Sequence, residues 1–414
     1  VWSGLYSESF AQRSNARGYD RIIVAEPAAY KAIMAACPET ISYDKAVTYL
    51  ATFAAQFEGV ENADVIIDNV SNDSAAAVNA LLRAGKNVAM ITEGDEKGNF
   101  ICSYEDFLTI AKDYVITATG VYGANYKAAV ILNPLVFLPG KPANNTSGYV
   151  ETTLRSGSYN YRFDWLARPA MGFTMTEDLS KANVIVGSQK LSDEALGAVK
   201  AGTPYMAYGA TAFMGEGNFL LGLGVKLDSC TMGTDFLGRV VYPSNTLVNA
   251  SYINEADDVM YEYGTNWFTK IPEGATVLVQ NAGKAPLQGC ICLTDDELTE
   301  EFNQYNNGVV GFEYQSGKLD MALFANVLNH KIHQTDEYTF ISNFIFSRSL
   351  TETAYEGVAQ PENPDPVNPG KPEEPGKPDA PKTGDTSSII VWVLAASFTV
   401  VMIPMTVTLK RKAR

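Results

Sequence analysis

From Ala182 to Tyr208 the chain reads ANVIVGSQKLSDEALGAVKAGTPYMAY, and this stretch determines the fold class. Two apolar runs, 183–186 and 205–208, enclose a segment with helical spacing that begins after Ser188 and ends at Gly202. Buried parallel strands read as continuous apolar runs, and a glycine after a helix supplies a left-handed C-cap. The stretch therefore predicts a β-α-β crossover with two parallel strands.

The same order of features occurs between Ala63 and Ile91, as ADVIIDNVSNDSAAAVNALLRAGKNVAMI. Apolar runs at 21–25 and 128–138 are the expected leading strands of the two copies. We therefore predict an α/β fold of two doubly wound parallel-sheet units, residues 1–126 and 127–355. Their parallel strands should include 65–68 and 184–187. Common descent of the two units and a shared constraint of the fold explain their likeness equally well.

Composition restricts the classes of protein and of partner. Hydrophobic residues make up 46% of the chain and charged residues 19%, as expected for globular α/β domains. The net charge is -16 although Lys410, Arg411, Lys412 and Arg414 end the chain, so we expect no nucleic acid partner. Five scattered cysteines do not form the pattern of a disulfide framework or a zinc ribbon. The pairing of Cys290 and Cys292 stays open.

The C-terminal region predicts a stalk and a membrane anchor. Residues 361–381 read PENPDPVNPGKPEEPGKPDAP, a composition that favours extended polyproline II over a packed core. The uncharged run Ile389–Leu409 is long enough for a membrane span, and the cations after it face the cytoplasm by the positive-inside rule. We expect a stalk at 356–387, a transmembrane helix at 388–409 and a cytoplasmic tail at 410–414. The rest of the chain, including its N-terminus, should lie at the cell surface.

The pentad Ala380-Pro381-Lys382-Thr383-Gly384 lies a few residues before the predicted span. The order of pentad, apolar span and basic tail resembles the LPxTG sorting signal of Gram-positive surface proteins. The resemblance implies that a sortase cuts between Thr383 and Gly384 and joins the threonine to cell-wall peptidoglycan. Because Ala380 occupies the leucine position, two outcomes stay open: cleavage by a sortase of altered specificity, or retention in the membrane.

Short motifs between Lys127 and Arg348 resemble the class I glutamine amidotransferase-like domain, a flavodoxin-like fold, that ends many exported bacterial proteins of the zinc carboxypeptidase family. The motifs are Arg168-Pro169-Ala170-Met171-Gly172-Phe173, Tyr208-Gly209-Ala210, Pro286-Leu287-Gln288-Gly289 and Ser316-Gly317-Lys318-Leu319. Active amidotransferases carry a nucleophilic cysteine on a sharp strand-to-helix turn. The matching turn here, Gly209-Ala210-Thr211, has no cysteine, and Cys230 lies some twenty residues further along. We therefore do not expect amide hydrolysis, and Thr211 is the hydroxyl nucleophile that this turn offers.

The two histidines, His330 and His333, are candidates for a metal or acid-base site together with Asp336 or Glu337. A structural role is favoured, because Lys331 separates the two imidazoles. The carboxypeptidase pattern of His-x-x-Glu with a distant third histidine cannot be assembled from them. We predict no cofactor and no metal in this stretch. If the family resemblance holds, the zinc site belongs to a catalytic domain upstream of Val1, which is not an initiator methionine.

Two functional hypotheses follow from these observations. In the first, the chain is the non-catalytic C-terminal part of a cell-surface zinc carboxypeptidase-like protein. In the second, it is a surface-displayed module that binds extracellular glycan or peptide and has no enzymatic activity. Aromatic and amide residues that could form a binding platform occur at 144–146, 158–161 and 261–268, although packing is the favoured role for most of them. The upstream sequence would discriminate between the hypotheses.

Overall fold

The computed structural model describes residues 63–357, with gaps at 112, 115, 123–125, 141–163, 165–166, 169, 215–216, 230–232, 253–257, 263–265, 284–287, 292–304 and 331–336. The chain divides into two compact units, Val1–Pro361 and Glu362–Arg414. The predicted strand 21–25, the stalk, the sorting pentad and the span at 388–409 lie outside the described residues. Within the described part of the chain, no helix has both the length and the apolar character needed to cross a bilayer.

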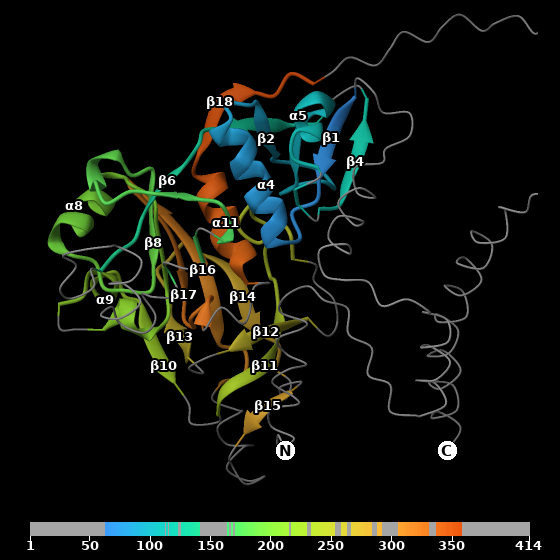
Figure 1. The fold of residues 1–414 in the computed structure, drawn as a ribbon. Coiled ribbons are helices and arrows are strands. Elements are labelled where there is room, and N and C mark those ends of the chain that lie inside the picture. Colours follow the sequence, from blue (N-terminus) through green and yellow to red (C-terminus); the bar gives the residue numbers. More distant parts are fainter. Residues whose placement is uncertain are drawn as a thin grey trace, which may run out of the picture. The chain divides into compact units, whose positions relative to one another are not determined.

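The first sheet has six strands in the order β18-β5-β2-β3-β1-β4, and every neighbouring pair is antiparallel (Figure 1). The strands are β1 (Asp64–Ile67), β2 (Val88–Ile91), β3 (Phe100–Ser103), β4 (Ala118–Val121), β5 (Ala128–Ile131) and β18 (Leu350–Ala354). Helix α4 (Asn72–Arg83) connects β1 to β2, and the short helix α5 (Tyr104–Leu108) follows β3.

The prediction of a doubly wound parallel sheet is wrong for this first unit. β3 pairs with both β1 and β2 in the antiparallel sense, so the two strands of the crossover run parallel to each other with β3 between them. The reason is the turn after β2, where Ile91 N donates to Asn99 O and Gly98 N donates to Ile91 O, both at 2.9 Å. This turn returns the chain beside β2, and a nearby hairpin partner pairs more readily than the strand beyond the crossover helix.

The second sheet is mixed and contains the predicted parallel strands. Its main path runs β12-β11-β14-β16-β17-β9-β8-β6-β7, and neighbours from β17 to β7 are parallel. The bounds are β6 (Leu135–Phe137), β7 (Thr174–Met175), β8 (Val184–Gly187), β9 (Tyr205–Tyr208), β10 (Lys226–Ser229), β11 (Gly233–Val241), β12 (Val259–Glu262), β13 (Asn266–Lys270), β14 (Thr276–Asn281), β15 (Gln288–Ile291), β16 (Val309–Ser316) and β17 (Leu319–Phe324). In chain order the parallel strands β7-β6-β8-β9-β17 read 2-1-3-4-5, the flavodoxin-like order. The fold is therefore α/β, and the parallel strand at 184–187 is confirmed.

Helices cover both faces of these parallel strands. Helix α8 (Asp193–Ala201) is capped by Ser192, and it ends at Gly202 in the left-handed conformation that the sequence predicted. Its Ala195 and Val199 pack with Ile185 of β8 on one face. Helix α11 (Tyr338–Ser347) packs on the other face (Figure 1). The remaining short helices are η1 (Leu179–Lys181), η2 (Ala210–Phe213) and α9 (Phe219–Gly222).

One hydrophobic core joins the two sheets. Residues from Tyr338 to Phe346 of α11 are all buried, and the apolar ones pack in a cluster with strands of both sheets and with α4. The predicted leading strand 128–138 is in fact two strands, because Pro134 interrupts it: β5 joins the first sheet and β6 the second. The domain boundary after residue 126 stays a prediction.

Candidate functional site

The candidate site lies at the carboxyl ends of β6, β8, β9 and β17. In open α/β sheets of this order, ligands bind outside the carboxyl ends of the strands, where the strand order reverses. That reversal occurs between β6 and β8. The turn that matches the amidotransferase elbow follows β9 at the same edge.

Gly209 occupies this turn, and only glycine fits there. Its φ is +82°, and a Cβ at this position would lie 2.5 Å from Cγ2 of Val327. The backbone N–H of Gly209 donates to Phe324 O at 3.0 Å, which ties the turn to the end of β17. The place where an elbow side chain would project is therefore filled by Val327.

The structure does not bring the predicted site residues together in one site within its described residues. Thr211 lies in η2 directly after the turn and is half-buried. His330 is fully buried after β17, whereas His333 and Cys230 lie outside the described residues. Among the residues that the structure describes, no group of three or more His, Cys, Asp or Glu side chains is placed to hold a metal ion.

Five buried polar residues gather at the carboxyl edge, and we name them the carboxyl-edge cluster: Asp164, Arg168, Ser188, Tyr208 and Asn329. Asp164 Oδ1 accepts from the Tyr208 hydroxyl at 2.6 Å and from Asn329 Nδ2 at 2.8 Å. Its Oδ2 accepts from the backbone N–H and the hydroxyl of Ser188, at 2.9 and 2.6 Å. All four acceptor positions of this carboxylate are thus occupied by protein groups.

The charge of Arg168 is balanced through Tyr208. Nη2 of Arg168 donates to the Tyr208 hydroxyl at 2.8 Å, and that hydroxyl in turn donates to Asp164. Burial raises the pKa of Tyr208 well above its usual value, and Asp164 adds to the rise, while the nearby Arg168 opposes it. Tyr208 therefore stays a neutral phenol that bridges a buried cation and a buried anion.

A second buried acid lies at the end of β12. Glu262 accepts from the hydroxyl of Tyr305 and, at 2.9 Å, from Nδ2 of Asn326, which lies two residues after β17. Burial raises the pKa of Glu262 to about 8, and the two hydrogen bonds oppose the rise. A Cβ at Gly238 would overlap the Glu262 carboxylate, so the strand beside it leaves room only for glycine. At neutral pH this carboxyl group is largely protonated.

Packing explains the aromatic residues that the structure describes in the predicted platform 261–268. Tyr261, Trp267 and Phe268 are each buried, and the ring of Trp267 meets Tyr305 edge-on with centroids 6.1 Å apart. These rings are therefore part of the interior and offer no flat surface to a sugar. The platform candidates at 144–146 and 158–161 lie outside the described residues.

Sequence reasoning missed the carboxyl-edge cluster and Glu262. The members of the carboxyl-edge cluster come from segments as far apart as Asp164 and Asn329, and no local spacing in the sequence relates them. A weak signal exists in hindsight: Ser188 and Tyr208 stand at the ends of the two predicted parallel strands, where polar side chains converge.

No family model matches the sequence, and no curated protein matches it. Among solved structures, a putative GMP synthase protein of Thermoplasma acidophilum is 11% identical, with a TM-score of 0.30, over 52% of this chain and 96% of its own. A glutamine amidotransferase of Thermotoga maritima is 9% identical, with a TM-score of 0.30, over 51% and 98%. A β-galactosidase of Bacillus circulans sp. alkalophilus is 13% identical, with a TM-score of 0.32, over 54% and 32%.

Proposed function

We propose that residues 1–355 form a non-catalytic α/β module of a larger cell-surface protein, displayed on the stalk at 356–387. The observation that carries this proposal is that the protein's own side chains occupy the described part of the carboxyl edge of the parallel strands. Val327 fills the space beside Gly209, and the carboxyl-edge cluster satisfies its central carboxylate from within the protein. An edge filled in this way supports a role in packing and presentation.

Nucleophilic catalysis at this edge would need an exposed nucleophile beside a base. Gly209 and Ala210 supply no nucleophilic atom, and the side chain of Ser188 is fully buried rather than exposed. Asp164 is saturated with donors and therefore has no acceptor position left for a substrate proton. These features support the absence of amide hydrolysis.

The parent protein in this proposal is a cell-surface zinc carboxypeptidase-like protein whose catalytic domain lies upstream of Val1. A sortase acts at Thr383, which joins the module to peptidoglycan, and the span at 388–409 holds the chain in the membrane before that step. The support is the order of stalk, Ala380–Gly384 pentad, apolar run and basic tail in the sequence. Zinc would belong to the upstream domain.

The activity test uses purified residues 1–360. We expect no hydrolysis of glutamine and no release of C-terminal amino acids from peptides, with or without added zinc. His330→Ala should leave this baseline unchanged. Turnover that disappears in His330→Ala or His333→Ala would show that these histidines belong to an active site, and the non-catalytic proposal would be wrong.

The display test uses the full chain in a Gram-positive host. Thr383→Ala should abolish the wall-linked product, and deletion of 389–414 should release the module into the medium. Lys382→Ala is a control, because it alters the pentad but keeps the proposed cleavage bond. Wall linkage that persists in Thr383→Ala would show that the pentad is only part of the stalk.

A further inference from the structure

The last described part of the module is fixed to both sheets immediately before the chain enters the predicted stalk. Helix α11 is buried in the shared core, Arg348 follows it, and β18 then joins the edge of the first sheet. Tyr355 comes directly after β18, and the proline-rich sequence begins at Pro361. A pull on the stalk therefore reaches Tyr355 and β18 first, then Arg348, and then α11.

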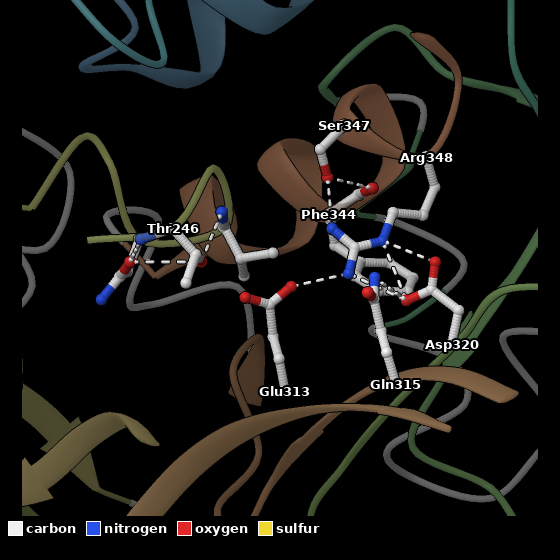
Figure 2. A network of polar contacts seen from close by, with 9 residues as sticks. Thr246, Glu313, Gln315, Asp320, Phe344, Ser347 and Arg348 are labelled. Carbon is white, nitrogen blue, oxygen red and sulfur yellow. Dashed lines mark hydrogen bonds and ion pairs between the residues drawn. The ribbon is translucent and has the colours of Figure 1, made fainter. Parts of the chain in front are cut away.

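Arg348 is bound to the second sheet by two carboxylates (Figure 2). Its Nε lies 3.1 Å from each carboxylate oxygen of Asp320, and its Nη2 lies 2.9 Å from Oδ1 of Asp320 and 2.6 Å from Oε1 of Glu313. The guanidinium carbon also lies 4.9 Å from the centroid of the Phe344 ring. The side chains of Arg348 and Glu313 are each only 10% exposed. Breaking a buried, charge-assisted pair of this kind is strongly unfavourable.

The next residues are bound to the first sheet by weaker contacts. Leu132 N donates to Ser349 O at 2.8 Å, and β18 pairs with β5 along the sheet edge. The Tyr355 hydroxyl donates to Oδ1 of the buried Asp64 at 2.8 Å. Arg348 and Ser349 are neighbours in the chain, so the attachment changes from one sheet to the other between them.

The amide side chain of Asn343 also attaches helix α11 to neighbouring segments. Nδ2 of Asn69, after β1, donates to Oδ1 of Asn343 at 2.5 Å, and Nδ2 of Asn343 donates to Val248 O at 3.2 Å. Removing α11 would open the shared core and break these bonds together. Within this junction, the helix is therefore the last element that tension on the stalk reaches.

We propose that Tyr338–Tyr355 is a force-resisting junction in which β18 yields first and the Arg348 clamp then holds the module folded. An edge strand is bonded on one side only, so β18 can detach while the rest of its sheet stays paired. Detachment of 349–357 frees a contour length of about 30 Å, at ~3.4 Å per residue. The clamp then keeps α11 in the core. This inference rests on the proposed display on the stalk, which is the source of the tension.

The test is single-molecule pulling of the full chain, with handles at Val1 and at the C-terminus. We expect a small first step from the release of 349–357, followed at higher force by cooperative unfolding. Arg348→Met should speed the second event about tenfold or more at a fixed force, equivalent to ~1.4 kcal/mol of barrier. Tyr355→Phe, which removes one hydroxyl, should lower the force of the small step alone. Lys181→Met is the matched control, because it breaks the exposed Lys181–Asp178 pair elsewhere.

A second pulling geometry separates resistance to force along the stalk from ordinary stabilisation. Handles at the exposed Lys190 and Lys270 pull on the chain between them, which does not contain 338–355. Arg348→Met should then change the unfolding rate at least threefold less than it does through the stalk. Equal effects in both geometries, or no small step, would overturn the proposal. If Arg348→Met does not fold, Arg348→Lys retains the charge without the bidentate geometry and takes its place.

Failure of the junction and failure of the proposed function give different experimental results. Hydrolysis by residues 1–360 would show that the module is catalytic, but β18 would still be expected to detach before the module unfolds. Wall linkage that persists in Thr383→Ala would remove the proposed attachment point, and the two-step extension would still be measured. If the small first step is absent while wall linkage still depends on Thr383, the force-resisting junction is rejected and the proposed display is not.

Discussion

The β1-α4-β2 and β8-α8-β9 units have the same order of elements, yet they are built into their sheets differently. β8 and β9 are hydrogen-bonded neighbours, whereas β3 separates β1 from β2. Both helices begin at a serine cap and end next to a glycine with positive φ. Local sequence thus specifies a crossover and its helix, while strand neighbours depend on what the chain does after the second strand.

The two units also differ at the carboxyl ends of their parallel strands. In the second unit, polar side chains at this edge are fully buried and mutually bonded around Asp164. In the first, Asp68 follows β1 and remains half-buried, with its pKa raised by burial and by the nearby Glu96. The edge of the second unit is therefore held together by one central carboxylate, whereas in the first Asp68 is partly solvated and the buried amide of Asn69 makes the contacts.

The largest effect should come from removing this central carboxylate. Asp164→Ala leaves the buried Arg168 without its balancing anion and deprives the donors of Ser188 and Asn329 of their acceptor, at a cost of about 3–5 kcal/mol. Asp68→Ala, the matched change in the first unit, should cost about 0.5 kcal/mol. Urea unfolding followed by circular dichroism measures both. Similar losses of unfolding free energy in the two variants would show that Asp164 is no more important to its edge than Asp68 is to the other.

Adding a methyl group should destabilise the turn after β9 more than the turn after β2. Gly209→Ala meets Val327 at 2.5 Å and also has a positive φ, so we expect a loss of about 2–4 kcal/mol. Gly94 lies in the corresponding turn of the first unit with φ +86° and open space around it, so Gly94→Ala should cost only ~1–2 kcal/mol.

Val327→Ala opens the space beside Gly209 and provides the internal check. In this background the additional cost of Gly209→Ala should fall toward that of Gly94→Ala, as a double-mutant cycle in urea would show. An unchanged cost would mean that backbone strain, and not the filled space, excludes a side chain from this turn.

Glu262 should make stability depend on pH in the second sheet. Its pKa rises from 4.5 to about 8 on folding, so between these values the native state binds a proton that the unfolded state releases. Stability is therefore fully present below pH ~4.5 and declines as pH rises toward 8, by about 1 kcal/mol per unit. Urea unfolding at pH 6 and pH 7 should show this decline, and Glu262→Gln should remove it. The exposed Glu352→Gln should retain the slope.

A small effect should come from the helix caps, where the two units are alike. Ser71 Oγ accepts from Ser74 N, and Ser192 Oγ accepts from Ala195 N, each at 3.2 Å. Each serine-to-alanine change should cost about 1 kcal/mol. A difference of more than ~1 kcal/mol between them, measured by thermal unfolding, would show that the helices are not equivalent in their local construction.

Several features of the fold were predictable because they depend on local spacing. The helix from Ser192 to Gly202, the parallel strand Val184–Gly187 and the absence of a thiol from the Gly209 turn follow from residues close together in the chain. The antiparallel first sheet was not predictable from the crossover pattern. Its order depends on β3, which follows β2 in a hairpin and pairs with β1 on its other side.

The site divides in the same way. Thr211 and His330 were visible as residue types, but their burial and separation depend on packing. Asp164 and Glu262 gave no sequence signal, because the atoms that define their environments come from distant segments. Their roles follow only once β17 brings Asn326 and Asn329 beside them.

The sequence by itself determined the α/β class and the crossover units, since these depend on composition and short-range periodicity, whereas the order of stalk, sorting pentad and span stays a prediction. Tertiary structure alone decided that α11 joins two sheets in one core, that Val327 occupies the space beside Gly209, and that Arg348 clamps the C-terminal segment. The physical reason is distance along the chain. Burial, ion pairing and exclusion of a side chain are energies between residues that only folding brings together.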